Sequence, residues 1–197
     1  MFNDKYGLTK AVLDGRKTMT RRLVPIKEAK RIESFFDSDD WDYAKQTCID
    51  DSAAYMIGET IAVAQSYKDL GYTKEWVEQH ISPNPNANWN DPFEKKYPGW
   101  NNKMFTHSEL KKVRKIEITN IKVERLQDIS DEDCMCEGVT WDYDDYPIMR
   151  RKVYLINDYE AFLSPSLAFA ALINRICGKS TWELNPYVFA YTFELVK

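Results

Sequence analysis

Apolar positions along the chain follow two periods, and each period predicts one type of element. Apolar residues recur at helical spacing in 4–14 and in 164–176, and each stretch is followed by a glycine that can end a helix, Gly15 and Gly178. Ser130 and Gly138 similarly bound a short predicted helix that ends at Glu137. Apolar residues alternate with polar ones, as in strands, in 18–24, 58–65, 114–126 and 185–195.

The clearest strand pattern changes phase in its middle. Ile116 and Ile118 alternate, and Ile121 and Val123 alternate one residue out of step. This shift predicts a bulge or a tight turn at Thr119-Asn120, because successive strand side chains point to opposite faces.

Long polar segments separate these patterned stretches. The segments at about 26–54, 66–105 and 140–157 are rich in polar or turn-forming residues and are expected to be irregular insertions, apart from a short helix at 73–80. Strands with interspersed helices but no regular βαβ alternation predict an α+β fold, built on a small and mostly antiparallel barrel. We expect one domain over 1–197.

Composition places the chain among ordinary globular proteins. Of its 197 residues, 44% are hydrophobic and 29% are charged, which is far from the composition of disordered chains. No apolar run is long enough to span a membrane and the N-terminus lacks a secretory signal, so we expect a cytoplasmic protein without a membrane partner. The four cysteines have no framework spacing, which predicts reduced thiols, no metal site and no cofactor.

The charge distribution is uneven. The net charge of −4 argues against a general nucleic-acid coat protein. The stretch GRKTMTRR nevertheless places four cations, Arg16, Lys17, Arg21 and Arg22, beside Thr18 and Thr20. A local basic patch is therefore expected on an acidic protein.

This stretch resembles the signature of the ASCH domain, a PUA-like β-barrel family common in bacteria and phages. The family pattern G-x-K-x-x-[E/T]-x-R is matched by Gly15, Lys17, Thr20 and Arg22. The flanking stretches IGETIAVAQSY, IEITNIKVERLQDISDEDCMCEGV and FAALINRICGKSTWELNPYVFAYTFEL are similar to the family's later strands and helices. The resemblance implies a PUA-like barrel of phage or prophage type, with long insertions.

Some small members of this superfamily are amidohydrolases that remove the acetyl group from acetylcytidine nucleosides. Their Lys, Thr and Glu match Lys17, Thr20 and Glu137. The resemblance thus implies these three as catalytic residues. Longer phage-type members carry Arg-Glu and an aromatic residue where this chain has Ala64-Gln65-Ser66-Tyr67, a place where a ligand could enter. We expect Gln65 and Tyr67, with Arg16, Arg21 and Arg22, to contact the substrate or nucleic acid, whose class the sequence leaves open.

The chemistry of Lys17, Thr20 and Glu137 also fits these roles when the family resemblance is set aside. A threonine hydroxyl needs a neighbouring base, and a lysine acts as one only when its pKa is lowered. The cations of Arg16, Arg21 and Arg22 would lower it, and they would also stabilise an oxyanion. Glu137 at a helix C-terminus favours the protonated carboxyl of a general acid. On an unbroken strand Lys17 and Thr20 would face opposite ways, so a turn at 16–18 is required.

Two other functions fit the same residues. In a non-catalytic module that binds RNA or a nucleotide, Lys17, Arg21 and Arg22 would contact phosphate while an aromatic residue stacks on a base. Tyr67, Trp89 and Trp100 are the candidates for that stacking. Alternatively, a phage protein-interaction module would use the acidic, aromatic insertions as its contact surface.

Overall fold

The chain divides into two compact units. The computed structural model describes residues 4–36, 38–102, 112–144, 150–156 and 160–196. The first unit takes in the described residues up to Glu59 together with Glu117–Leu195, and the inserted unit is Thr60–Ile116 with Val196. The expectation of a single PUA-like domain stays a prediction, and each unit is described by itself.

The fold is α+β, as expected, with an antiparallel half-barrel sheet and flanking helices. The larger sheet has the strand order β1-β7-β3-β2, and a smaller antiparallel sheet has the order β4-β5-β6. In the larger sheet, β1 pairs antiparallel with β7, with Met19 opposite Thr192 and Leu23 opposite Val188. The strands are β1 (Met19–Leu23), β2 (Thr60–Ala62), β3 (Lys115–Arg125), β4 (Thr140–Asp144), β5 (Arg151–Leu155), β6 (Ala161–Phe162) and β7 (Tyr187–Val196).

Two helices of the first unit begin at serines whose side chains cap them. The hydroxyl of Ser130 accepts a hydrogen bond from the Asp133 amide, and that of Ser164 accepts one from the Leu167 amide. The helices of this unit are η1 (Asp4–Tyr6), α1 (Leu8–Leu13), α2 (Ile26–Ser34), α3 (Trp41–Ser52), η3 (Leu126–Asp128), α6 (Asp131–Cys136), α7 (Pro165–Cys177) and α8 (Thr181–Leu184). The expected helices at 130–137 and 164–176 are confirmed apart from shifts at their ends, whereas the one expected at 4–14 is divided into η1 and α1 at Gly7, whose φ is 65°.

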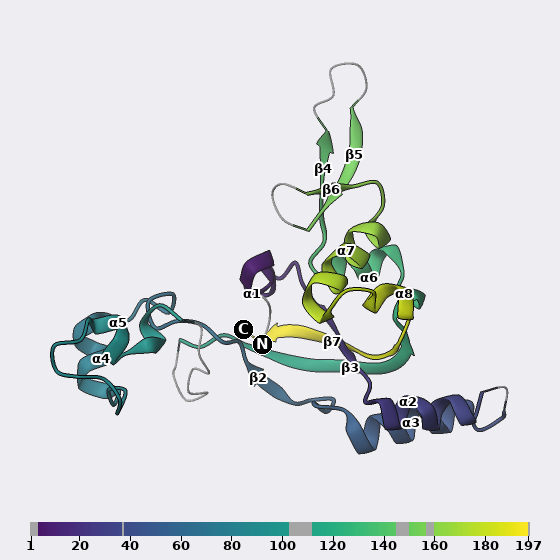
Figure 1. Ribbon diagram of the computed structural model, residues 1–197, viewed down its shortest axis with the longest axis horizontal. Coiled ribbons are helices and arrows are strands. Elements are labelled where there is room, and N and C mark those ends of the chain that lie inside the picture. Colours follow the sequence, from purple (N-terminus) through teal and green to yellow (C-terminus); the bar gives the residue numbers. More distant parts are fainter. Residues whose placement is uncertain (1–3, 37, 103–111, 145–149, 157–159, 197) are drawn as a thin grey trace. The chain divides into compact units, whose positions relative to one another are not determined.

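The core of the first unit lies where α6 and α7 pack against each other over the larger sheet (Figure 1). Phe169 and Leu172 of α7 meet Cys134 of α6 and Val188 of β7 in one buried cluster. All residues of β7 from Tyr187 to Tyr191 are buried, so this inner strand is covered on both faces.

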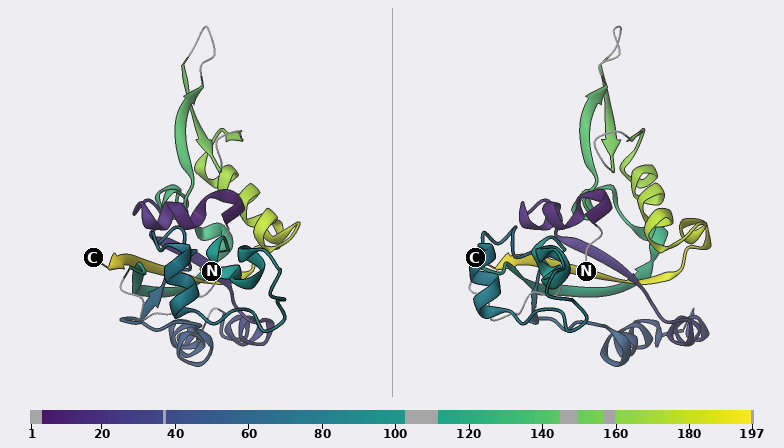
Figure 2. Two further views of the ribbon diagram at one scale, coloured as in Figure 1. Left: turned by 90° about the vertical axis from the view of Figure 1, so that its left-hand side faces the viewer. Right: turned by 60° about the vertical axis from the view of Figure 1, so that its left-hand side comes forward.

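Two segments expected to be irregular contain regular elements, and here the expectation is wrong. Segment 26–54 holds α2 and α3, which lie side by side (Figure 1, Figure 2). Each buries few apolar side chains, mainly Ile32 in α2 and Cys48 and Ile49 in α3. The helical period is weak in α3, whereas in α2 it is carried by few apolar residues among many charged ones. Segment 140–157 holds the antiparallel pair β4 and β5, where an acidic run obscured the alternation.

The inserted unit is built from short elements joined by turns. Its helices are α4 (Lys74–His80), α5 (Phe93–Lys96) and the 3₁₀ helix η2 (Pro98–Trp100). The short helix expected at 73–80 is therefore confirmed, and Thr73 caps it by accepting a hydrogen bond from the Trp76 amide. The rings of Tyr72, Trp76 and His80 form a stack with centroids 4.0 and 4.4 Å apart.

The phase change in β3 occurs within one continuous strand, which rules out the tight turn. Thr119 and Asn120 are both exposed between the buried Ile118 and Ile121. The Asn120 side chain accepts a hydrogen bond from the Ile121 amide at 2.9 Å. This local bond accounts for the one-residue shift in which face is buried.

Candidate functional site

Lys17 reaches the interior because the chain turns sharply after α1. Gly15 adopts a φ of 73°, a left-handed conformation that favours glycine. The amides of Arg16 and Lys17 both donate to the carbonyl of Ala11, at 2.9 and 3.0 Å. The turn required at 16–18 is thus present, and β1 begins only at Met19.

The end of α6 brings Glu137 to the same place. Glu137 is the last residue of helical conformation, and Gly138 follows with a φ of 108°. The Thr18 amide donates to the carbonyl of Cys136 at 2.9 Å, which joins the end of α6 to the start of β1. Two residues 120 positions apart in sequence therefore meet.

Lys17 and Glu137 form a buried ion pair. The Lys17 Nζ lies 2.7 Å from Glu137 Oε2, and the two side chains are only 2% and 6% exposed. The same amine also donates to the main-chain oxygens of Met19 and Glu137, at 2.7 and 2.8 Å. Three acceptors therefore surround an amine that water scarcely reaches.

Arg21 extends the pair into a larger ionic cluster, which runs from the buried pair to the exposed Lys122 and which we define as Lys17, Arg21, Lys122, Glu124, Asp133 and Glu137. Arg21 Nη1 donates to Glu137 Oε1 at 3.1 Å, and Arg21 Nη2 contacts Glu124 at 2.6 Å and Asp133 at 2.9 Å. Lys122 adds a contact with Glu124 Oε2 at 2.8 Å. Three cations face three carboxylates, so the cluster is balanced in charge.

Burial and charge act in opposite directions on the two inner cations. Burial lowers the pKa of Lys17, and the Glu137 carboxylate only partly offsets this. The neighbouring charges of Arg22 and Arg21 lower the same pKa further. For Arg21 burial also lowers the pKa, but the carboxylates of Glu137 and Glu124 outweigh it, so that its pKa is raised. Lys17 is thus the cation of the cluster whose pKa is lowered, whereas the pKa values of Arg21 and Lys122 are raised.

Thr20, the third predicted catalytic residue, is not a member of the ionic cluster around Lys17 and Glu137. It lies in β1 opposite Tyr191 and is half-buried. Strand alternation places it on the face opposite Arg21. Within the described part of the chain, no hydrogen bond joins its hydroxyl to Lys17 or Glu137.

The remaining cations of the segment are exposed. Arg16 forms an ion pair with Asp14 at 3.3 Å, and Arg22 lies in β1 opposite Phe189. The expected basic patch is therefore divided, because Lys17 and Arg21 are buried among carboxylates and only Arg16 and Arg22 are at the surface.

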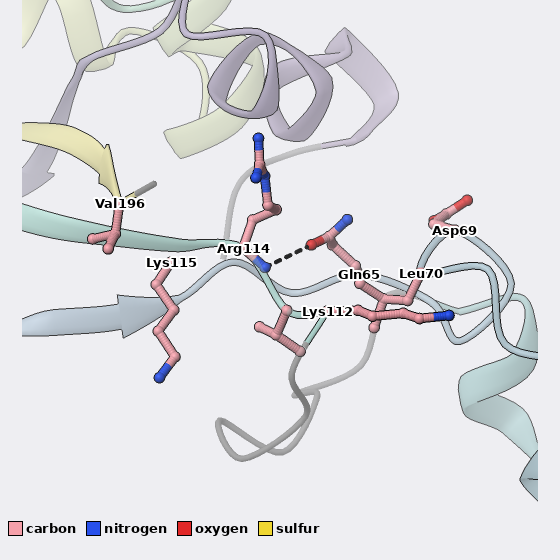
Figure 3. A pocket seen from close by; sticks show the side chains of 8 residues that line it. Gln65, Asp69, Leu70, Lys112, Arg114, Lys115 and Val196 are labelled. Atoms are coloured by element: carbon pink, nitrogen blue, oxygen red, sulfur yellow. Dashed lines mark hydrogen bonds between the residues drawn. The ribbon is translucent and has the colours of Figure 1, made fainter.

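Gln65 and Tyr67 lie in the inserted unit. Both are buried, and Gln65 Oε1 accepts a hydrogen bond from the Arg114 amide at 3.2 Å. The Tyr67 ring packs on Gly99 so closely that a Cβ there would lie 2.7 Å from its Cε2 atom. The Tyr67 ring is therefore used in packing, whereas Gln65 lines a pocket (Figure 3). Trp89, by contrast, is 89% exposed.

Comparison with family models, curated proteins and solved structures found no match.

In the described ranges, no three His, Cys, Asp or Glu side chains are grouped to hold a metal ion. None of the described helices is long and apolar enough to cross a membrane. Cys134 is fully buried, and burial raises the pKa of its thiol to about 12.

Sequence reasoning missed Glu124, Asp133 and Lys122 as members of the cluster. Lys122 and Glu124 share one face of β3, because they are two residues apart on a strand. The sequence marks Asp133 only as the residue three positions after the Ser130 cap. Opposite charges on one strand face were a signal, but the pairing with Arg21 depends on the tertiary fold.

Proposed function

We propose that this protein is an ASCH-type amidohydrolase that cleaves an N-acyl group from a nucleoside-like substrate. The observation that carries the proposal is the buried contact of Lys17 with Glu137 at 2.7 Å. The resemblance assigns catalytic roles to these two residues, and nothing in their local sequence requires them to meet.

The ion pair supplies the acid and the base together. Transfer of one proton from Lys17 to Glu137 converts the pair into a free amine and a protonated carboxyl. The lowered pKa of Lys17 favours this transfer. The amine then takes the proton of the Thr20 hydroxyl, whose oxygen attacks the acyl carbon.

The remaining steps complete the cycle. The protonated Glu137 gives its proton to the nitrogen as the C–N bond breaks, which releases the nucleoside amine. Water then hydrolyses the acyl ester on Thr20 and releases the carboxylic acid. Substrate binding must bring the Thr20 hydroxyl to Lys17, since no hydrogen bond joins the two here.

The charge environment favours hydrolysis over phosphate binding at this site. In a phosphate-binding module Lys17 and Arg21 would be available to an anion. Here each already contacts carboxylates, and Arg21 alone contacts three. Binding phosphate at these residues would require breaking buried ion pairs.

The test is acetate release from N4-acetylcytidine by the wild type and by Lys17→Arg, Thr20→Ala and Glu137→Gln. Each substitution is expected to reduce kcat by at least about a hundredfold, because arginine cannot act as the base and glutamine cannot supply the proton. Lys10→Gln, which changes an exposed lysine of α1, serves as the charge-matched control and should retain full activity. Wild-type activity in folded Lys17→Arg would falsify the assignment.

A further inference from the structure

A pocket in the inserted unit has the chemistry of an anion site. Its cavity measures about 540 Å³, which is within the range of small-molecule sites. The lining residues are Gln65, Asp69, Leu70, Lys112, Val113, Arg114, Lys115 and Val196, all of them in this unit (Figure 3). Two strand-like stretches frame it, because the Val63 amide donates to the carbonyl of Arg114 at 2.9 Å.

Positive charge dominates the pocket lining. The lining residues include three cations, Lys112, Arg114 and Lys115, and a single carboxylate, that of Asp69, and Arg114 and Lys115 project to opposite sides of their strand (Figure 3). Asp69 is also engaged within its own loop, where its carboxylate and main chain exchange hydrogen bonds with Ser66. On a chain whose net charge is −4, this local excess of two positive charges is a strong contrast.

Gln65 gives the pocket a directed hydrogen-bond donor. Only 6% of Gln65 is exposed, and its Oε1 is held by the Arg114 amide at 3.2 Å. This bond fixes the amide orientation, so that Nε2 is the end left to donate. In the described part of the chain, no residue accepts a hydrogen bond from Nε2. The buried side-chain atoms without a hydrogen-bond partner there are Glu28 Oε2 and Arg31 Nη2, so Nε2 is not one of them. The Nε2 atom therefore keeps accessible surface, and Gln65 is one of the residues that line the pocket.

We propose that this pocket binds the phosphate group of a small organic phosphate of nucleotide size. A phosphate is opposite in charge to this lining, and it accepts the hydrogen bond that Gln65 Nε2 offers. The volume admits a mononucleotide, and Lys112 sits 4.7 Å from the centre of the Tyr72 ring, beside the stack formed with Trp76. The site is independent of the amidohydrolase proposal, since it shares no residue with Lys17, Thr20 or Glu137.

The test measures binding of AMP to the full-length protein by calorimetry, with inorganic phosphate, citrate and a single-stranded RNA oligonucleotide as parallel probes. Gln65→Glu keeps the acceptor for the Arg114 amide but places a negative charge beside the ligand. Arg114→Gln removes one cation and keeps that amide. Each variant is expected to weaken AMP binding by at least about tenfold. Lys95→Gln removes an exposed lysine of the same unit outside the pocket and should bind AMP as the wild type does.

Each outcome decides the proposal. AMP binding that is lost in both pocket variants and kept in Lys95→Gln supports it. RNA binding with the same variant pattern also supports phosphate recognition and assigns the phosphate to a nucleic-acid backbone. Absence of binding by AMP, phosphate and RNA overturns it, and so does citrate binding as tight as AMP binding, or equal weakening in Lys95→Gln. Acetate release by the Lys17 variants is measured separately, so failure of one proposal is distinguishable from failure of the other.

Discussion

At the scale of single residues, Glu137 matters most, because it contacts two buried cations. Glu137→Gln leaves Lys17 and Arg21 with one carboxylate fewer in a site that excludes water. We expect the free energy of unfolding to fall by about 3–5 kcal/mol, which is typical of a broken buried pair. Urea unfolding followed by circular dichroism measures it. Glu132→Gln, an exposed position on the same helix, should change it by less than about 0.5 kcal/mol.

The lowered pKa of Lys17 predicts a pH dependence with a definite sign. Between its folded-state pKa and the unfolded value of 10.5, the unfolded chain binds more protons at this residue than the folded chain. The contribution of Lys17 to stability therefore rises with pH across this interval.

Comparison of the wild type with Lys17→Met isolates this contribution from other titrating groups. The difference in unfolding free energy should shift in favour of the wild type as pH increases from neutral toward 10. A difference that stays constant, or that moves the other way, would contradict burial as the dominant cause.

At the scale of elements, the end of α6 decides whether the cluster can form. Gly138 has a φ of 108°, and a Cβ there would lie 3.0 Å from Leu8 Cδ2 and 3.6 Å from Lys17 Cδ. Gly178 at the end of α7 has a similar φ of 115°, but a Cβ there meets nothing within 4 Å.

Gly138→Ala is therefore expected to cost more stability than Gly178→Ala. Both substitutions carry backbone strain of about 1–3 kcal/mol, and only the first adds a steric contact. Thermal unfolding of the two variants gives the comparison. Equal losses would show that the contact with Leu8 relaxes freely.

The elements also show which structural features the sequence predicts and which it does not. Ser130, Ser164 and Gly178 marked helix ends correctly, because caps act through nearby residues. The weakly apolar helices α2 and α3 were missed, since few of their residues are buried. The contact of Lys17 with Glu137 was expected only through the family resemblance. The partners of Arg21 were not expected at all, because no local pattern encodes which strand and helix ends meet.

At the scale of the whole molecule, the inserted unit leaves and rejoins the first unit at hydrogen-bonded neighbours. The Ile118 amide donates to the carbonyl of Glu59 at 3.0 Å, and the Gly58 amide donates to the carbonyl of Ile118 at 2.8 Å. A short connection can therefore replace the intervening chain at little cost in loop closure.

Replacing Thr60–Ile116 by a short glycine–serine linker should leave a first unit that still unfolds cooperatively. All members of the ionic cluster lie in that unit. Glu137→Gln should therefore cost about the same stability in the shortened chain as in the full one. Thermal and urea unfolding of the four proteins checks this. A shortened chain without a cooperative transition would contradict it.

The close approach of Glu59 and Ile118 also bears on how such a protein can change over generations. Insertions and deletions between these two positions lengthen or shorten a loop whose ends are already held together, and the spacing from Lys17 to Thr20 is untouched. Homologous chains should therefore differ most in length within this interval, and selection for new ligands can act there while the contact of Lys17 with Glu137 is inherited unchanged.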